Sequence, residues 1–314
     1  MLTILGPTAT GKTALAARLA FELNGEVISA DSRQVYRGMN IGTGKDYDDY
    51  NVNGVQIPCH LIDIVDPGYE YNIFEFQKDF LKAYNDIIAR KKLPVLCGGS
   101  GMYLEAVLKG YQLAKAENDE GFMAALEDKS DDQLAGILRS FTTPHNITDF
   151  EDRPRLLKAI LVARSSIPGI IPGINPGDTG AGVFPEIKSI VFGIDYPRGL
   201  VKARIRKRLE YRLDNGMITE VEQLLSGGIS PERLMKYGLE YKFVTLYLTG
   251  KISRSDLLVD LNIAIRQFAK RQMTWFRRME RQGIKIHWID GRMPVGKKVA
   301  EIRLVAGSQC PSTP

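Results

Sequence analysis

Four residues near the start of the chain have the types and spacing of a phosphate-binding loop. Gly6, Gly11, Lys12 and Thr13 match the pattern G-x-x-x-x-G-K-[ST] in full. Glycines let backbone N–H groups turn toward phosphate oxygens, a following helix adds its partial positive charge, and the lysine adds a full one. The Thr13 hydroxyl suits a magnesium ion. ATP or GTP is the usual ligand of such a loop, but the motif alone does not decide which phosphate compound binds. The residues predicted to bind phosphate are Gly6, Pro7, Thr8, Ala9, Thr10, Gly11, Lys12 and Thr13.

Two more polar side chains follow apolar runs and are expected near this loop. Residues 26–30 read as a strand that ends at Asp31, and residues 94–97 read as a strand followed by a glycine turn and Ser100. In open α/β sheets, ligands bind at the carboxyl ends of the strands, so both side chains should face the same crevice as the loop. An acid at a strand end also serves as a helix cap, and a glycine turn alone is a weak signal. Both residues are therefore candidates for the site.

The elements that must position these residues alternate between strand and helix. Such alternation predicts an α/β fold, with a parallel sheet flanked by helices as in P-loop NTPases. Between two of the strands, residues 39–46 read as an exposed loop, whose Lys45 either supports catalysis or is solvated. The predicted strands are 2–5, 26–30, 61–65, 94–97 and 187–194, and the predicted helices beside them are 12–24 and 73–91.

Composition places the chain among ordinary globular proteins. Its 314 residues are 44% hydrophobic and 25% charged, which is enough for a large core. The three cysteines, Cys59, Cys97 and Cys310, are widely spaced, which favours a reducing cytoplasm. The three histidines are isolated and predict no metal site. No apolar run is long enough to cross a membrane and no signal peptide is recognisable, so a soluble protein without a membrane partner is expected.

The middle of the chain predicts a helical insertion. Residues 111–166 contain short helical patterns at 120–129, 131–141 and 153–164 and no strand pattern, and a Pro/Gly-rich connection follows. The predicted organisation is a core of 1–110 and 184–290, an insertion of 111–183 and a peripheral tail of 291–314.

Charge is distributed unevenly between the two halves. Residues 1–150 carry a net charge of −7 and residues 151–314 a net charge of +12. Six of the eleven residues at 202–212 and six of the sixteen at 266–281 are basic, and Phe268, Trp275 and Phe276 interrupt the second stretch. Basic residues with aromatics between them suit a nucleic-acid backbone and unstacked bases, although a solvated charged face is the competing interpretation. The asymmetry favours a polyanionic partner.

Six segments of the sequence, by their order and spacing, resemble the tRNA dimethylallyltransferases, also called tRNA isopentenyltransferases. The resemblance implies transfer of a dimethylallyl group from dimethylallyl diphosphate to the exocyclic amino group of the adenosine 3′ to the anticodon, in tRNAs that read codons beginning with U. The absence of a zinc-finger extension resembles the bacterial members. The segments are 6–13, 29–36, 39–45, 60–67, 98–103 and 266–277.

Carried over residue by residue, the resemblance implies four catalytic residues. Asp31 aligns with the general base, while Lys12, Ser100 and Arg204 hold the diphosphate, with Mg²⁺ bound at Thr13. The insertion is expected to grip the anticodon stem-loop of a tRNA, and the protein is expected to be a monomer. The predicted tRNA-binding residues are Asp31, Ser32, Arg33, Gln34, Pro154, Arg155, Lys158, Lys270 and Arg271.

Three departures from the family pattern and three rival functions stay open. Gly42-Thr43-Gly44-Lys45 replaces Gly-Thr-Ala-Lys, Ser100 replaces a threonine but keeps the hydroxyl, and 237–242 is longer than the family's Gly-Tyr-Lys/Arg, so roles in 237–242 are not assigned.

The rival functions are a nucleotide kinase, an isopentenyltransferase acting on free adenine nucleotides, and a nucleic-acid-binding ATPase. The ATPase would use Asp63 to poise water with magnesium.

Overall fold

The structure is a computed structural model that describes residues 1–113, 120–141, 153, 156–157, 159–161 and 184–309. The chain divides into two compact units. The larger unit consists of Met1–Lys109 with Ile187–Pro314, and the smaller one of Gly110–Glu186.

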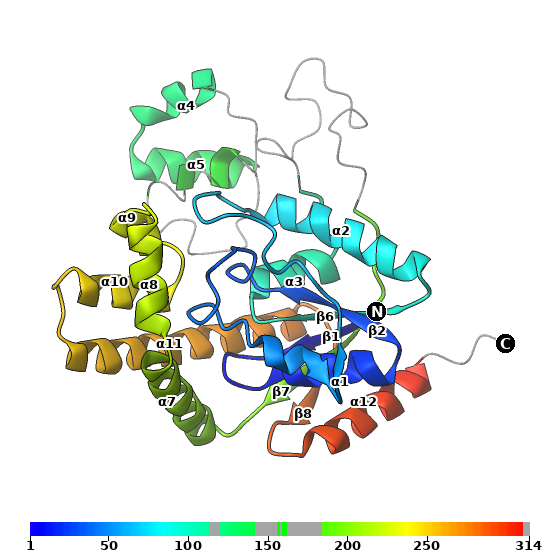
Figure 1. Cartoon of the computed structure of the whole chain (residues 1–314). Coiled ribbons are helices and arrows are strands. Elements are labelled where there is room, and N and C mark those ends of the chain that lie inside the picture. Colours follow the sequence, from blue (N-terminus) through cyan, green and yellow to red (C-terminus); the bar gives the residue numbers. More distant parts are fainter. Residues whose placement is uncertain (114–119, 142–152, 154–155, 158, 162–183, 310–314) are drawn as a thin grey trace. The chain divides into compact units, whose positions relative to one another are not determined.

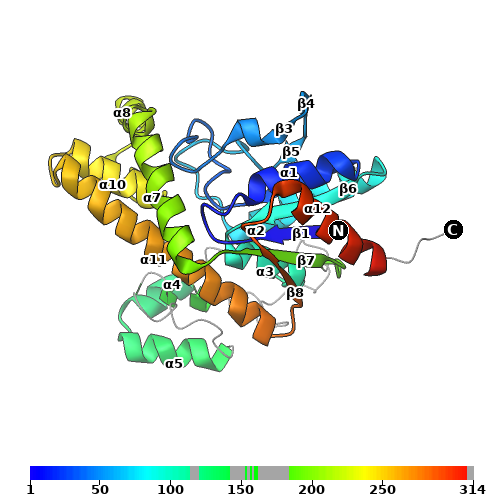
Figure 2. The ribbon, with the colours of Figure 1, turned by 90° about the horizontal axis from the view of Figure 1, so that it is seen from below.

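A six-stranded sheet in which all strand pairs are parallel forms the centre of the larger unit (Figures 1 and 2). The register aligns the carboxyl ends of the inner strands, because Gly98 is paired with both Ala30 and Leu5, and Leu5 is also paired with Gly193. The loops that leave these strands therefore begin at one edge of the sheet. The spatial order is β5 (Cys59–His60), β2 (Gly25–Ala30), β6 (Leu93–Gly98), β1 (Leu2–Leu5), β7 (Ile190–Asp195) and β8 (Ile286–Asp290).

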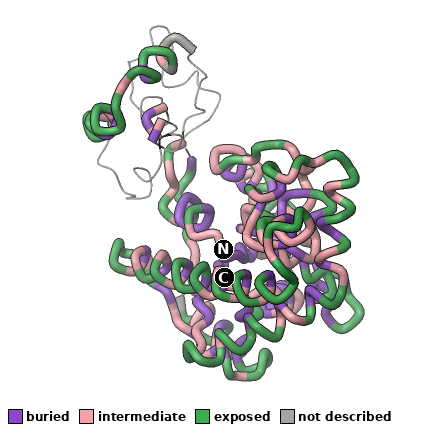
Figure 3. The backbone as a smooth tube through the Cα atoms, turned by 90° about the vertical axis from the view of Figure 1, so that its left-hand side faces the viewer, coloured by how far each residue is buried: buried purple, intermediate pink, exposed green. Residues whose placement is uncertain are grey.

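The strands form where the sequence is apolar, and helices cover them. Every residue of β1 and β2 is buried, as expected for inner strands of a parallel sheet covered on both faces. Helix α2 (Ile73–Ala89) begins with a capping box between Asn72 and Glu75 and buries Phe76 and Phe80. Figure 3 colours the buried residues purple, and in the larger unit they gather in its interior. The other elements next to this sheet are α1 (Lys12–Glu22), η1 (Tyr47–Tyr50), the hairpin β3–β4 (Asn51–Val52 and Val55–Gln56) and α3 (Gly101–Leu108).

The strand predicted at 61–65 is wrong. The strand in this region is β5, at Cys59–His60, and the chain leaves the sheet immediately afterward. Leu61 and Asp63 have φ angles of 64° and 55°, in the left-handed region that a regular strand does not use. Residues 61–65 instead form an irregular loop, in which Val65 forms an isolated β-bridge with Tyr36.

Five further helices of the larger unit share an apolar cluster. Tyr241, Val244 and Leu261 lie at its centre with less than 2% exposure. The longest helix, α11, passes beside α7 and α10 and leads to β8 (Figures 1 and 2). The helices are α7 (Arg198–Asp214), α8 (Met217–Ser226), α9 (Pro231–Leu234), α10 (Leu239–Leu248) and α11 (Arg254–Arg281).

The prediction of a peripheral tail at 291–314 is also wrong for most of this segment. Residues Val295–Gln309 form α12, and Val299 and Ile302 on this helix are almost completely buried in the core that contains α1 and β1. Their spacing of three residues places both side chains on one helix face. Residues 310–314 lie outside the described part of the chain.

The described residues of the smaller unit form helices α4 (Glu120–Glu127) and α5 (Asp131–Phe141) and no strand. Leu126, Leu134 and Leu138 are the centre of its apolar cluster. Arg153 donates to the carbonyl oxygens of Leu126, Glu127 and Lys129, and so satisfies groups that the end of α4 leaves free. Of the helix predicted at 153–164 only part is described, and the Pro/Gly-rich segment 167–183 lies outside the described residues.

Candidate active site

The phosphate-binding loop connects β1 to α1. Gly11 precedes the helix with φ of 77°, and no acidic residue lies in the first turn, so the N-terminus of α1 keeps its positive field. The Thr10 hydroxyl donates to the Pro7 carbonyl oxygen at 2.8 Å and stabilises the turn from within. The Lys12 ammonium donates to the same oxygen at 3.4 Å. The loop thus has the conformation and the charge that a phosphate ligand requires.

Asp31 and Ser100 lie together at the carboxyl edge of the sheet. The backbone N–H of Ser32 donates to the Ser100 hydroxyl oxygen at 3.0 Å, which joins the segment after β2 to the turn after β6. Asp31 is half-buried and accepts from the backbone N–H of Arg33 at 2.9 Å. Burial lowers the pKa of the Lys12 ammonium, and the negative charge of Asp31 opposes that shift. Asp31 therefore lies within electrostatic reach of the loop lysine.

Gln272 on α11 bridges the two glycine turns. Its amide oxygen accepts from the backbone N–H of Thr8 at 2.9 Å, and its amide nitrogen donates to the carbonyl oxygen of Gly99 at 2.8 Å. Gln272 is buried, so neither bond competes with water. A β-carbon at Gly99 would collide with this amide, which explains the glycine there. The Gln272 amide holds the phosphate loop and the Ser100 turn in a fixed relation.

Arg204, Arg208 and Arg212, one turn apart on α7, form a row of cations that we call the inner row, in which Arg212 is buried, Arg208 is half-buried and Arg204 is exposed. Arg204 donates to the carbonyl oxygen of Ala9 at 2.8 Å, Arg208 donates to the hydroxyl of Thr8, and Arg212 pairs with Asp46 at 3.0 Å. Burial, with the nearby guanidinium of Arg212, lowers the pKa of Arg208 to about 10, so Arg208 is cationic at neutral pH. The three side chains turn toward the phosphate loop and Asp46. The contact of Arg204 with the loop is compatible with its predicted role in holding a diphosphate, which stays a prediction.

The aromatic residues of α11 are also mostly internal. Phe276 is fully buried, and the Trp275 indole donates to the Glu105 carboxylate at 2.8 Å. Arg278 pairs with the same carboxylate at 2.6 Å. Burial raises the pKa of Glu105, but Lys109 and Arg278 together hold it below its usual value. The predicted stacking of bases is therefore wrong for Phe276, which is fully buried, whereas Trp275 is half-buried and Phe268 is exposed.

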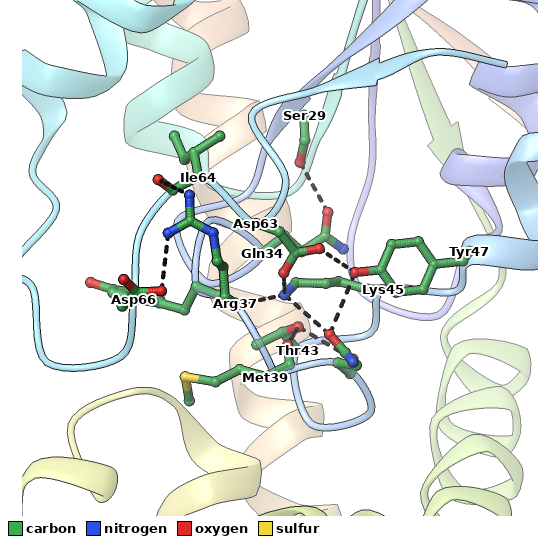
Figure 4. Close-up of polar contacts among 12 residues, drawn as sticks. Ser29, Gln34, Arg37, Met39, Thr43, Lys45, Tyr47, Asp63, Ile64 and Asp66 are labelled. Carbon is green, nitrogen blue, oxygen red and sulfur yellow. Dashed lines mark hydrogen bonds and ion pairs between the residues drawn. The ribbon is translucent and has the colours of Figure 1, made fainter. Parts of the chain in front are cut away.

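Lys45 is neither solvated nor free. Its side chain is buried, and its ammonium donates to the Asp63 carboxylate and to the carbonyl oxygen of Tyr36 (Figure 4). Tyr47 donates to the other oxygen of Asp63. Burial lowers the pKa of Lys45, and Asp63 opposes the shift. These contacts among Lys45, Tyr47 and Asp63 fix the loop that follows Asp31, and they engage both carboxylate oxygens of Asp63.

Glu220 anchors this loop from α8. Its carboxylate accepts from the backbone N–H groups of Asn40, Ile41 and Gly42 at 2.7–3.0 Å and from the Tyr241 hydroxyl at 2.6 Å. Nothing in the sequence singles out Glu220, because the backbone N–H groups that it binds lie about 180 residues earlier in the chain.

The predicted tRNA-binding residues have different environments. Arg33 is exposed, whereas the Gln34 amide is engaged by Ser29 and by Gly44, inside the fold. Lys270 and Arg271 are exposed on α11, and neither forms an ion pair with an acid among the described residues. Pro154, Arg155 and Lys158 lie outside the described residues.

A large open cavity of about 1330 Å³ lies beside the phosphate loop. Pro7 belongs to its lining, together with the ends of β7 and β8 and residues of α7 and α11. The charged residues of its lining are mostly basic, since Asp195 and Asp290 are the only acids that the described residues contribute to it. The basic residues are Arg198, Lys202, Arg266, Lys270, Arg277, Arg281 and Arg292.

A cluster of three or more His, Cys, Asp and Glu side chains that would bind a metal does not occur among the described residues. Magnesium bound with a phosphate ligand needs few protein groups, since phosphate oxygens and waters supply the others. The half-buried Thr13 hydroxyl at the start of α1 has no side-chain hydrogen bond among the described residues and fits that role. No helix in the described part of the chain is long and apolar enough to span a membrane.

An all-parallel sheet with this loop after an inner strand, and a carboxylate and a hydroxyl at the same edge, defines a phosphate-binding P-loop α/β protein. Residues 34–279 match the family model described as IPP transferase, and residues 1–56 match the model described as isopentenyl transferase. The chain belongs to the IPP transferase family.

Relatives span nearly the whole chain. A Bacteroides fragilis protein named tRNA dimethylallyltransferase 2 is 50% identical over 299 residues, covering 95% of each chain. A Phocaeicola vulgatus protein of the same name is 52% identical over 302 residues, covering 96% of each.

Solved structures have the same fold. The crystal structure of a tRNA isopentenylpyrophosphate transferase from Staphylococcus epidermidis matches with a TM-score of 0.69 and 29% identity, covering 98% of this chain and 99% of that one. A eukaryotic dimethylallyltransferase acting on tRNA matches with a TM-score of 0.74 at 24% identity, covering 98% and 78%, and supports the fold alone.

Proposed function

We propose that this protein transfers a dimethylallyl group from dimethylallyl diphosphate to the exocyclic amino group of an adenosine in tRNA. The acceptor is the adenosine 3′ to the anticodon, in tRNAs that read codons beginning with U. The observation that carries the proposal is the position of Asp31 and Ser100 at the sheet edge where the phosphate loop and Arg204 lie. A site with a base and a diphosphate cradle side by side suits a reaction in which diphosphate leaves.

Asp31 acts as the general base. An adenine amino nitrogen is a poor nucleophile because its lone pair is delocalised into the ring. As the nitrogen forms its bond to the allylic carbon, the carbon–oxygen bond to diphosphate breaks, and the amino proton passes to a carboxylate oxygen of Asp31. An ionised carboxylate has a free lone pair within the candidate site and can accept this proton.

The phosphate loop and the inner row stabilise the leaving group. Negative charge grows on the diphosphate oxygens as the bond to carbon breaks, so cations that are already in place lower the barrier. Lys12 and Arg204 supply those charges, and the Ser100 hydroxyl and the loop amides supply hydrogen bonds. Magnesium held by Thr13 would neutralise further charge on the diphosphate.

Exposed cations bind the tRNA. The target base must leave the anticodon-loop stack to reach Asp31, and backbone contacts hold the RNA while it does. We assign those contacts to Ser32, Arg33, Lys270 and Arg271 and to Pro154, Arg155 and Lys158 of the insertion. Gln34 is not assigned one, because it is buried and its side chain is engaged by Ser29 and Gly44. The enzyme is proposed to act as a cytoplasmic monomer.

The rival functions fit the site less well. A water-activating ATPase would require Asp63 to be available, but Lys45 and Tyr47 engage both of its carboxylate oxygens. A transferase acting on free adenine nucleotides has no use for the exposed cations Lys270 and Arg271.

The test is a labelled transfer reaction. With radiolabelled dimethylallyl diphosphate, magnesium and unmodified tRNA, label should enter the tRNA and not AMP; entry into AMP alone would exclude the proposal. Asp31→Asn should lower the single-turnover rate by about 10²–10⁴-fold while tRNA affinity is retained, since only the proton acceptor is lost. If tRNA affinity falls and the single-turnover rate is retained, Asp31 is a binding residue.

A further inference from the structure

Ser100 immediately precedes helix α3 but does not cap it. A serine at this position ordinarily accepts a hydrogen bond from a backbone N–H of its own helix. The Ser100 hydroxyl makes no such bond. It accepts instead from the backbone N–H of Ser32 at 3.0 Å and donates to the Ser32 hydroxyl oxygen at 3.4 Å. The hydroxyl is therefore turned toward the segment that follows β2, and another group has to hold the first turn of α3 in place.

Trp275 on α11 contacts that turn at two points. Its ring lies so close to Gly101, the first residue of α3, that a β-carbon there would lie 2.4 Å from a ring atom. One turn further along α3, the buried carboxylate of Glu105 accepts from the Trp275 indole N–H at 2.8 Å. Two contacts one turn apart, made by a single rigid ring, fix both the position and the rotation of the start of α3.

The Trp275 ring is itself held in place. The guanidinium of Arg278, one turn later on α11, lies 4.0 Å from the centre of the ring, where a cation is attracted to an indole. Arg278 also pairs with the Glu105 carboxylate at 2.6 Å, and Lys109 pairs with the other oxygen of that carboxylate at 3.0 Å. The ring and the carboxylate that bind each other are thus each fixed by a further partner.

Both residues that flank Ser100 contact the same face of α11. Gln272 donates to the carbonyl oxygen of Gly99, and Trp275, three residues later on the helix, lies against Gly101. Ser100 lies between these two contacts. A hydrogen-bond donor stabilises a developing charge most when it is already aimed at the position where that charge will appear. The two contacts with α11 provide such an arrangement for the Ser100 hydroxyl.

We propose that Trp275 is a positioning residue for Ser100, and that together with Glu105 it aims the Ser100 hydroxyl at the diphosphate. The inference rests on the proposed function for the role of Ser100. It gives Trp275 a task within the site, in place of the base stacking that the sequence suggests. Trp275 acts through the backbone of Gly101, so its effect on the substrate should depend on the Ser100 hydroxyl.

The test is a double-mutant cycle on the binding of inorganic diphosphate with magnesium, measured by calorimetry in the full-length protein. Ser100→Ala should weaken binding roughly ten- to hundredfold, the loss expected for one hydrogen bond to a charged group. Trp275→Phe keeps an aromatic ring but removes the indole N–H, and should weaken binding about three- to tenfold, as for residues that act as a unit. In the Ser100→Ala background, Trp275→Phe should have no further effect.

Trp288→Phe is the matched control. The Trp288 indole also donates to a glutamate, Glu280, at 2.7 Å, and the Arg277 guanidinium lies 4.3 Å from the centre of its ring, but this ring packs on Gly193 of β7. Any effect of Trp288→Phe on diphosphate binding should be the same with and without the Ser100 hydroxyl. The proposal is overturned if Ser100→Ala or Trp275→Phe leaves diphosphate affinity unchanged, or if Trp275→Phe weakens it equally in both backgrounds.

Gly101→Ala tests the same contact from α3. Its β-carbon would collide with the Trp275 ring, so the substitution should weaken diphosphate binding. In a Trp275→Leu background the ring is gone, and Gly101→Ala should not weaken binding further. Equal losses in both backgrounds would contradict the proposed contact.

Thermal unfolding separates positioning from a purely structural role. A lower melting temperature of the Trp275→Phe variant, combined with unchanged diphosphate affinity, would show that Trp275 only stabilises the fold. Diphosphate binding is measured without tRNA, so failure of the labelled transfer with an intact cycle would count against the proposed function alone. Successful transfer with an additive cycle would count against the positioning role alone.

Discussion

Helices α7 and α11 are both rich in arginine and lysine, yet they use these residues in opposite ways. On α7 the inner row of Arg204, Arg208 and Arg212 turns toward the phosphate loop and Asp46. On α11 Lys270 and Arg271 are exposed and without acidic partners among the described residues. The buried face of α11 contributes a neutral amide, Gln272, to the same loop. Helix α7 therefore places positive charge at the candidate site. Helix α11 aligns the two glycine turns of that site through Gln272 and places its own positive charge on the surface.

The difference shows that a count of basic residues does not identify a nucleic-acid surface. The net charge of +12 in the second half includes cations that belong to internal sites, such as Arg208 and Arg278. A guanidinium can be buried at moderate cost when it keeps several hydrogen bonds, whereas an exposed lysine keeps its hydration. Only the cations that face solvent are available to a polyanion.

The largest expected effect is on the inner row. Arg204→Ala should lower kcat for transfer by about 10²–10³-fold, because it removes a charge that stabilises the leaving diphosphate. Affinity for tRNA should change less than twofold, since Arg204 belongs to the phosphate site. Steady-state kinetics with separate tRNA-binding measurements would establish both values.

Arg206→Ala is the matched control for that experiment. Arg206 is exposed on the same helix and pairs with Glu210, so its loss should leave kcat unchanged. If Arg204→Ala and Arg206→Ala both weakened tRNA binding and spared kcat, α7 would be an RNA-binding helix and the comparison with α11 would fail.

An intermediate effect is expected for the buried face of α11. Gln272→Leu leaves the Thr8 N–H and the Gly99 carbonyl without their partner, which should lower the free energy of unfolding by about 1–3 kcal/mol. The two glycine turns would also lose their fixed relation, so KM for dimethylallyl diphosphate should rise. Urea unfolding and transfer kinetics measure the two quantities.

The exposed Gln267 on the same helix provides the control. Gln267→Leu should leave both the unfolding free energy and KM near their original values. Equal effects of the two substitutions would mean that α11 responds to any added apolar side chain, and that the Gln272 amide has no particular role.

Much of the site can be predicted from local sequence because its residues come directly after strands. The sequence pattern of the phosphate loop specifies the conformation of that loop. A parallel sheet brings the carboxyl ends of its strands to one edge, which is why Asp31 and Ser100 were predictable candidates. The structure brings them together as expected, through the hydrogen bond from Ser32 to Ser100. Their catalytic roles stay proposals until activity is measured.

The residues that escaped prediction act over long sequence distances. Gln272 contacts residues 173 and 264 positions earlier, and no local pattern specifies such a contact. A signal did exist, because Gln272 falls on the helix face of Ile265, Ala269 and Phe276, where a polar residue is out of place. Arg212 likewise shares a face with the apolar Ile205 and Leu209. A polar residue within an apolar stripe indicates an internal partner.

The smallest effect is expected on the exposed face of α11. Replacing Lys270 or Arg271 singly by alanine should reduce the slope of log affinity for tRNA against log salt by roughly 0.7–0.9, because each variant releases one fewer counterion. The transfer rate at saturating tRNA should not change. Arg254→Ala, at the first turn of the same helix and beside Asp214, is the control and should keep the original slope. If the slopes of all three variants equal that of the original protein, the outer face of α11 is solvated, and the RNA-binding charges must be sought elsewhere in the second half of the chain.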